Sequence, residues 1–144
     1  VEFGPGLTVQ MRRLAADRDA GEASAVEHEL EDPGPIEDEL KAAGFVRILK
    51  PFQIQNLATL LRLPHGADFS VPGAGKTTVA LASYAVNRYR GQIQRMLVIG
   101  PIAAFEAWKV DARDCFVTPL KITVHSGADV VIPNDTDILL TNYN

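Results

Sequence analysis

Cysteine is nearly absent from this sequence, which has a single one, Cys115, among its 144 residues. One cysteine excludes an internal disulfide and a Cys-x-x-Cys pair, so we expect Cys115 to be a small apolar core residue. Long hydrophobic runs are absent too, since no stretch approaches the roughly 18 residues that a membrane helix needs. Residues 1–6 lack the basic and apolar segments of a signal peptide. These absences predict an intracellular, cytoplasmic protein (nucleoid-associated if bacterial) without a membrane partner.

Positive charge is also scarce, with 14 Lys and Arg against 18 Asp and Glu, and a net charge of −4 argues at first sight against a nucleic-acid partner. The charge is unevenly distributed, however. Residues 1–40 hold 3 Arg against 11 Asp and Glu, a net −8, whereas residues 41–144 carry +4. We therefore expect an acidic, helical N-terminal appendage over residues 1–35 and a domain over residues 36–144 whose mild positive charge permits contact with phosphates. The acidic run around His28 fits a solvated surface better than a metal site, because metal ligands must converge.

Apolar periodicity and the positions of Gly and Pro predict helices that alternate with strands. The expected helices are Ile36–Ala43, Pro51–Leu63, Lys76–Arg90 and Ala103–Arg113, and the expected strands are Ala67–Phe69, Met96–Ile99, Ile122–His125 and Asp137–Leu140. Such alternation is typical of a parallel sheet with right-handed crossovers. The predicted fold class is therefore α/β, with a mainly parallel twisted sheet flanked by helices.

The most informative segment is Ser70–Thr78, a small-residue loop between an expected strand and an expected helix. Its two glycines can adopt backbone angles closed to other residues and leave room for phosphate oxygens beside main-chain N–H groups. The following helix adds unpaired N–H groups and the positive end of its dipole. Lys76 can reach the β- and γ-phosphates and Thr77 can ligate Mg²⁺, so both are candidate catalytic residues. The candidate cofactor-binding residues of this Walker A type of P-loop, for ATP and Mg²⁺, are Pro72, Gly73, Ala74, Gly75, Lys76, Thr77 and Thr78.

Ser70 stands where the common pattern G-x-x-x-x-G-K-[ST] has its first glycine. Ala or Ser at this position is typical of superfamily-two helicases, and from this loop outward, residues 44–144 resemble the first RecA-like lobe of that family. The resemblance is strongest to Snf-type DNA translocases and bacterial DEAD/DEAH helicases. Leu49–Gln53 is similar to the family's L-[RK]-P-[YF]-Q segment, which implies that Gln53 reads the adenine edge. A carboxamide suits that role, because it offers a donor and an acceptor side by side.

Two further segments resemble the parts of this family that contact the nucleic-acid backbone. Met96–Pro101, followed by Trp108 and Asp111, is similar to motif Ia, and Asp137–Tyr143 is similar to the family's D-[VI]-[VLI]-[IL]-T-[TN]-Y segment. The resemblance implies that a nucleic acid, with DNA expected before RNA, contacts Pro101, Ile102, Ala103, Thr141 and Asn142. We expect Trp108 to anchor the core and His125 to have a structural role at a strand end.

The resemblance also implies a larger enzyme, an ATP hydrolase that needs a D-E-x-x box and a second RecA-like lobe. Neither follows Tyr143, so we expect this chain to be a partial first lobe that belongs to an ATP-dependent helicase or translocase and is inactive in hydrolysis alone. Asn144 stands where the family usually has an acid, which leaves the subfamily open. Two alternatives are a P-loop kinase or GTPase-like switch, against which the order of the segments argues, and a non-catalytic nucleotide-binding domain.

Overall fold

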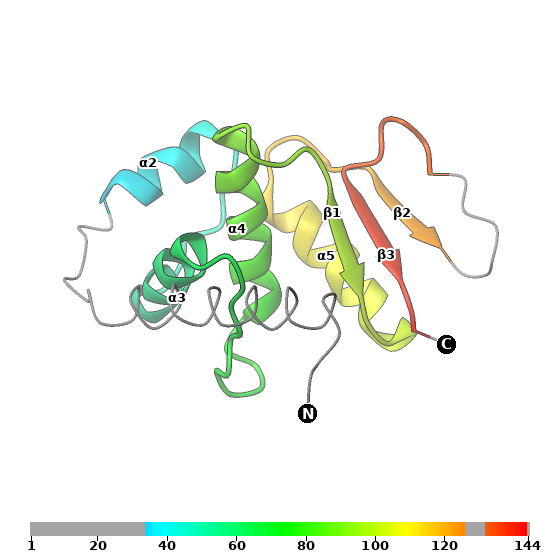
Figure 1. Ribbon diagram of the computed structural model, residues 1–144, viewed down its shortest axis with the longest axis horizontal. Helices are drawn as coiled ribbons and strands as arrows, with labels where there is room; N and C mark the ends of the chain where they lie inside the picture. The colour runs from blue at the N-terminus through cyan, green and yellow to red at the C-terminus, as the bar shows by residue number, and fades with distance from the viewer. Residues whose placement is uncertain (1–33, 126–131, 144) are drawn as a thin grey trace, which may run out of the picture.

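The computed structural model describes residues 34–125 and 132–143, in which helices and strands alternate (Figure 1). The predicted acidic appendage lies outside the described residues except for its last two positions, where a helix already begins. Over the described part of the chain, no helix is long and apolar enough to cross a membrane. The elements are α2 (Gly34–Ala42), α3 (Pro51–Arg62), α4 (Lys76–Tyr89), β1 (Met96–Ile99), the 3-10 helix η1 (Ile102–Ala104), α5 (Phe105–Cys115), β2 (Ile122–His125) and β3 (Ile138–Thr141).

Local signals place the ends of α2 and α4 and the start of α3 within one residue of their predicted positions, whereas α2 begins at Gly34, two residues before its expected start. Gly44, with φ +75°, and Gly91, with φ +71°, occupy the left-handed region just beyond α2 and α4. After α2, the N–H of Phe45 reaches back to the carbonyl of Leu40, which is the six-residue hydrogen bond of a Schellman motif. Pro51 is the first residue of α3, where its missing N–H and fixed φ cost nothing.

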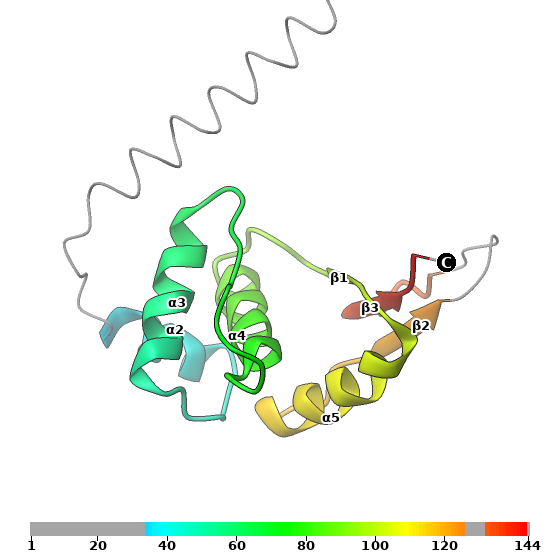
Figure 2. The same cartoon turned by 90° about the horizontal axis from the view of Figure 1, so that it is seen from below.

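The sheet has three parallel strands in the order β1-β3-β2, which confirms the prediction of a parallel sheet. Strands β1 and β2 have the predicted bounds, and β3 begins one residue later than expected. Figure 2 shows α5 beneath the sheet, with α2, α3 and α4 grouped to one side of it. This arrangement is an α/β domain with helices flanking a small sheet.

Helix α4 is the centre of the helical part, because it packs against α2, α3 and α5. Its buried residues cover a wide face of the helix, and Leu81, Ala82 and Val86 are fully buried. The opposite face, with Ser83 and Asn87, is only half-buried. The rings of Phe45 and Phe116 pack edge to face at 5.4 Å and join the segment after α2 to the end of α5.

The expected strand Ala67–Phe69 is wrong. These residues have an irregular conformation, and the Phe69 side chain is 93% exposed. A strand is stabilised by ladder hydrogen bonds to a neighbour, and within residues 34–125 and 132–143 no strand pairs with this segment. The expected helix Ala103–Arg113 is also shifted, because residues 102–104 form η1 and α5 extends to Cys115.

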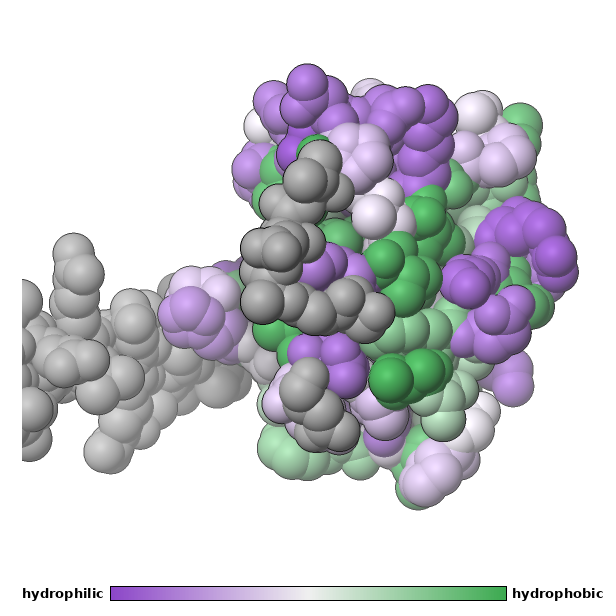
Figure 3. All heavy atoms as spheres, turned by 90° about the vertical axis from the view of Figure 1, so that its right-hand side faces the viewer, coloured by the Kyte–Doolittle hydropathy of each residue, from purple (hydrophilic) through white to green (hydrophobic). Residues whose placement is uncertain are grey.

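Strand β1 is buried on one face only, whereas its unbroken apolar sequence predicts burial on both. Val98 is buried, but the side chains of Leu97 and Ile99 are 57% and 60% exposed. Alternate residues of a strand face opposite sides, so these two point away from the covered face. Hydrophobic surface is also visible from the sheet side of the molecule (Figure 3).

Candidate functional site

The loop of residues 70–75 has the backbone geometry that a phosphate site requires. It contains no helix or strand, and Gly73 and Gly75 each have φ +83°. Gly75 is the N-cap residue of α4, and no side chain forms a cap hydrogen bond there. The N–H groups of the first turn, which lack helical partners, are therefore left without a side-chain acceptor. An uncapped helix start behind a glycine loop is suited to bind an anion.

The ammonium group of Lys76 folds back over this loop and donates to the carbonyl oxygen of Ser70. At the other side of Ser70, its N–H donates to Asp68 Oδ1 at 2.9 Å. Hydrogen bonds from the Ser70 side chain and backbone, together with the nearby charge of Lys76, lower the pKa of Asp68. The carboxylate of Asp68 therefore stays ionised and holds the N–H of Ser70 at the start of the loop. Lys76, just after the loop, holds the carbonyl of the same residue.

The carboxamide of Gln53 connects α3 to the loop. Gln53 is 7% exposed, its Oε1 accepts from the N–H of Lys50 at 2.9 Å, and its Nε2 donates to the carbonyl of Ala74 at 2.8 Å. A Cβ on Gly75 would lie 2.5 Å from Gln53 Nε2, which is closer than real Cβ contacts allow. Glycine at position 75 is thus favoured by its positive φ, and a larger residue there would also have to displace the amide end of Gln53.

The two threonines after Lys76 have different surroundings. Thr77 is half-buried, and Thr78 is 5% exposed with its hydroxyl oxygen accepting a hydrogen bond from Arg47 Nη1 at 3.0 Å. The same nitrogen donates to Asp111 Oδ1 at 2.8 Å on α5. Sequence reasoning missed Arg47, although a charged residue inside the apolar stretch Phe45–Leu49 is a signal that could have found it.

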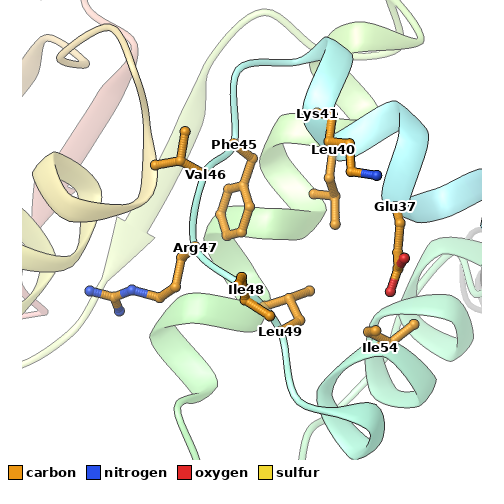
Figure 4. A pocket seen from close by; sticks show the side chains of 9 residues that line it. All are labelled: Glu37, Leu40, Lys41, Phe45, Val46, Arg47, Ile48, Leu49 and Ile54. Carbon is orange, nitrogen blue, oxygen red and sulfur yellow. The ribbon is translucent and has the colours of Figure 1, made fainter.

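A cavity of about 230 Å³ lies between α2, the segment before α3, and α3 itself (Figure 4). Its apolar lining includes Leu40, Phe45 and Ile54, with the charged Glu37 and Lys41 also on the wall. Gln53 does not line it, because its side chain turns to the loop. The cavity is therefore next to the Gln53 segment without being part of the loop site.

The predicted nucleic-acid segments come together at the carboxyl end of the sheet. Ile99 is in register with Thr141, and the N–H of Gly100 donates to the carbonyl of Thr141 at 3.0 Å. Pro101, Ile102 and Ala103 are exposed, whereas Thr141 and Asn142 are half-buried. Figure 1 shows the start of α4 at this same end of the molecule. The structure thus brings the two segments side by side, on the end of the domain that also carries the loop.

The other residues singled out from the sequence are described here by their burial and contacts. Trp108 is partly buried and packs against the core, as expected, and His125 is half-buried at the end of β2. Cys115 is fully buried, and burial raises the pKa of its thiol to about 11. Over residues 34–125 and 132–143, no three His, Cys, Asp or Glu side chains could hold a metal ion together. His28 and its acidic neighbours lie outside the described residues.

Substituting the two loop glycines separates backbone strain from the Gln53 contact. Gly73→Ala places a Cβ with nothing within 4 Å, so it should cost only the left-handed conformation, ~1–2 kcal/mol of unfolding free energy. Gly75→Ala carries the same cost and also displaces the Gln53 amide, which adds ~1–3 kcal/mol for the hydrogen bond lost at Ala74. Urea unfolding measures the free energy of unfolding of both variants. Equal decreases in the two variants would show that a side chain at position 75 does not displace Gln53.

Comparison with known proteins gives a distant structural relationship. No protein-family model matches the sequence, and no curated protein sequence matches it. Among solved structures, the chain is similar to the Sulfolobus solfataricus SWI2/SNF2 ATPase core in complex with dsDNA, with 26% sequence identity and a TM-score of 0.57. The match covers 69% of this chain and 22% of that one, so the chain spans less than a quarter of its solved relative. The chain therefore has a helicase-like ATPase fold.

Proposed function

We propose that this chain is the ATP-binding portion of a nucleic-acid-dependent ATPase, a DNA helicase or double-strand translocase. The observation that carries the proposal is the loop: α4 starts without a side-chain cap behind two left-handed glycines, in a chain similar to a SWI2/SNF2 ATPase core. Because the chain covers 22% of that core, we assign hydrolysis to a larger protein with a second RecA-like lobe. We expect that protein to be intracellular.

The loop residues fit a Mg-ATP triphosphate. The space beside Gly73 is open, and the loop and first-turn N–H groups of α4 are suited to phosphate oxygens. In the structure Lys76 donates to the neutral carbonyl of Ser70, and a charged phosphate oxygen is a stronger acceptor. We expect Lys76 to exchange that carbonyl for the β- and γ-phosphates and Thr77 to ligate Mg²⁺. The metal would neutralise phosphate charge when bound.

The assignment of Gln53 to adenine is compatible with its existing contacts. A carboxamide has two N–H hydrogens and an oxygen with two lone pairs. The bonds to Ala74 and Lys50 use one donor and one acceptor position, so one of each is left. These two positions are the ones we assign to adenine, which Gln53, buried in this structure, would meet once its amide edge becomes accessible.

The paired segments after β1 and β3 are proposed to contact the DNA backbone. The helical segment here begins with the exposed turn of η1, whose N-cap residue, Pro101, forms no side-chain cap hydrogen bond. Unpaired N–H groups at a helix start bind phosphates without reading the bases. The dsDNA in the solved SWI2/SNF2 complex supports DNA as the partner.

Replacing Lys76 with Ala tests the phosphate site. The charge-assisted contact that it removes is of a kind worth ~1.5–3 kcal/mol, so affinity for Mg²⁺ and a non-hydrolysable ATP analogue should fall roughly 10- to 150-fold. Titration calorimetry provides the measurement. Lys109→Ala is the matched control, because Lys109 pairs with Glu106 on the surface of α5. Unchanged binding in Lys76→Ala would refute the loop assignment.

Replacing Gln53 with Ala tests whether this residue recognises the adenine base. Affinity for both nucleotides can fall, because the contact to Ala74 is lost as well, so the informative quantity is the ratio of ATP to GTP affinity. That ratio should drop several-fold, on the order of one hydrogen bond to the base. Gln55→Ala, an exposed position on the same helix, should leave the ratio as it is in the wild type. A wild-type ratio in Gln53→Ala would mean that Gln53 serves the loop alone.

A negative charge on η1 tests the nucleic-acid assignment. Ala103→Glu should weaken binding to duplex DNA at least several-fold and leave nucleotide affinity unchanged, whereas Ala42→Glu, at an exposed position of α2, should change neither. Wild-type affinity should be insensitive to sequence and fall roughly tenfold or more between 50 and 200 mM salt, because phosphate contacts release counterions. Fluorescence anisotropy measures both effects. Salt-resistant, sequence-selective binding would contradict the assignment.

A further inference from the structure

Arg47 joins two helices through a single guanidinium group. Its Nη1 donates to Thr78 Oγ1 at 3.0 Å and to Asp111 Oδ1 at 2.8 Å, and its Nη2 lies 3.7 Å from Asp114 Oδ2. The Arg47 and Asp111 side chains are only 31% and 27% exposed. In Figure 4 the guanidinium extends away from the cavity, toward the side of the ribbon that carries α5. The hydrogen bond to Asp111 raises the pKa of Arg47, so the group stays charged.

Thr78 and Asp111, the two residues that Arg47 joins, lie next to two different proposed sites. Thr78 is the third residue of α4, directly after the proposed Mg²⁺ ligand, Thr77. Asp111 lies within α5, the helix that continues from the Pro101–Ala104 segment beside Thr141. The Arg47 side chain therefore connects the first turn of α4, at the proposed phosphate site, to α5, which follows the proposed nucleic-acid segment.

The charge of Arg47 is already compensated, which argues against a direct phosphate contact. Asp111 accepts a short hydrogen bond from it, and Asp114 lies near its other nitrogen. The hydrogen bonds to Thr78 and Asp111 both come from the same nitrogen, Nη1, so a movement of Thr78 that displaces this nitrogen also changes its bond to Asp111.

We propose that Arg47 is a positioning residue that couples occupation of the phosphate loop to the position of α5. The inference rests on the proposed function, since it needs a nucleotide at the loop. When phosphate and Mg²⁺ fix the first turn of α4, Thr78 and Arg47 fix Asp111 and with it α5. Coupling between two sites is reciprocal, so nucleotide should strengthen DNA binding by the factor by which DNA strengthens nucleotide binding.

The test compares the 144-residue chain with Arg47→Ala and Arg47→Lys, and with Arg113→Ala as the matched control. Arg113 is 68% exposed on α5 and, within the described residues, forms its ion pair with its neighbour Asp114. Amide hydrogen exchange of α5 and affinity for a DNA duplex are measured with and without Mg²⁺ and a non-hydrolysable ATP analogue. In the wild type and Arg113→Ala, the analogue should slow exchange in α5 and raise DNA affinity about fivefold or more.

Both responses should disappear in Arg47→Ala while the variant remains folded and still binds the analogue. Arg47→Lys keeps the charge, but its ammonium nitrogen ends one atom short of Nη1 and should not bridge Thr78 and Asp111, so it should restore neither response. Full restoration would overturn the geometric link. Asp111→Ala, which removes the acceptor on α5 and lies outside the loop, should behave like Arg47→Ala and replaces it if that variant does not fold. Wild-type responses in Arg47→Ala would overturn this inference alone. Failure of the wild type to bind the analogue would overturn the proposed function and the inference with it.

Discussion

The carboxamide of Gln53 fills the space beside Gly75 that a side chain at that position would need. Its Nε2 lies 2.5 Å from the place of that missing Cβ and donates to the carbonyl of Ala74. This contact fixes the loop against the start of α3, and the loop in turn fixes where α4 begins. The direction of the first-turn N–H groups, the position of Lys76 and the contact between Thr78 and Arg47 all depend on that starting point.

Helix α4 combines a buried body with an end that carries no cap. Packing against α2, α3 and α5 holds the body in place. The helix start, by contrast, has a left-handed glycine where Ser, Thr, Asp or Asn would supply a capping oxygen. The missing cap leaves N–H groups and the positive end of the dipole directed at the loop. A rigid helix with an unsatisfied end is the arrangement that an anion site needs, because the donors are already oriented before the ligand arrives.

Parallel strand order accounts for the location of the proposed nucleic-acid site. In a parallel sheet the carboxyl ends of all strands meet at one edge, so the segments that follow β1 and β3 become neighbours although some 40 residues of chain separate them. The hydrogen bond from Gly100 to Thr141 fixes this pairing. Since α5 follows the first of these segments and its Asp111 accepts a hydrogen bond from Arg47, which also bonds Thr78, hydrogen bonds connect α5 to the start of α4.

Local sequence patterns were enough to predict the irregular loop around Gly73 and Gly75, the helix ends near Gly44 and Gly91, and the bounds of three strands to within one residue. Each of these features depends on backbone preferences or on side chains a few positions apart. The nucleotide and nucleic-acid roles assigned to these segments stay predictions. Sequence patterns failed at residues 67–69, where apolar composition suggested a strand, because a strand exists only if a neighbour pairs with it. Only the tertiary structure decided that Gln53 contacts Gly75 and Ala74 and that Arg47 bridges Thr78 and Asp111. Such contacts join residues up to 64 positions apart, and no local pattern encodes which distant side chains the packing of helices will bring within hydrogen-bonding distance.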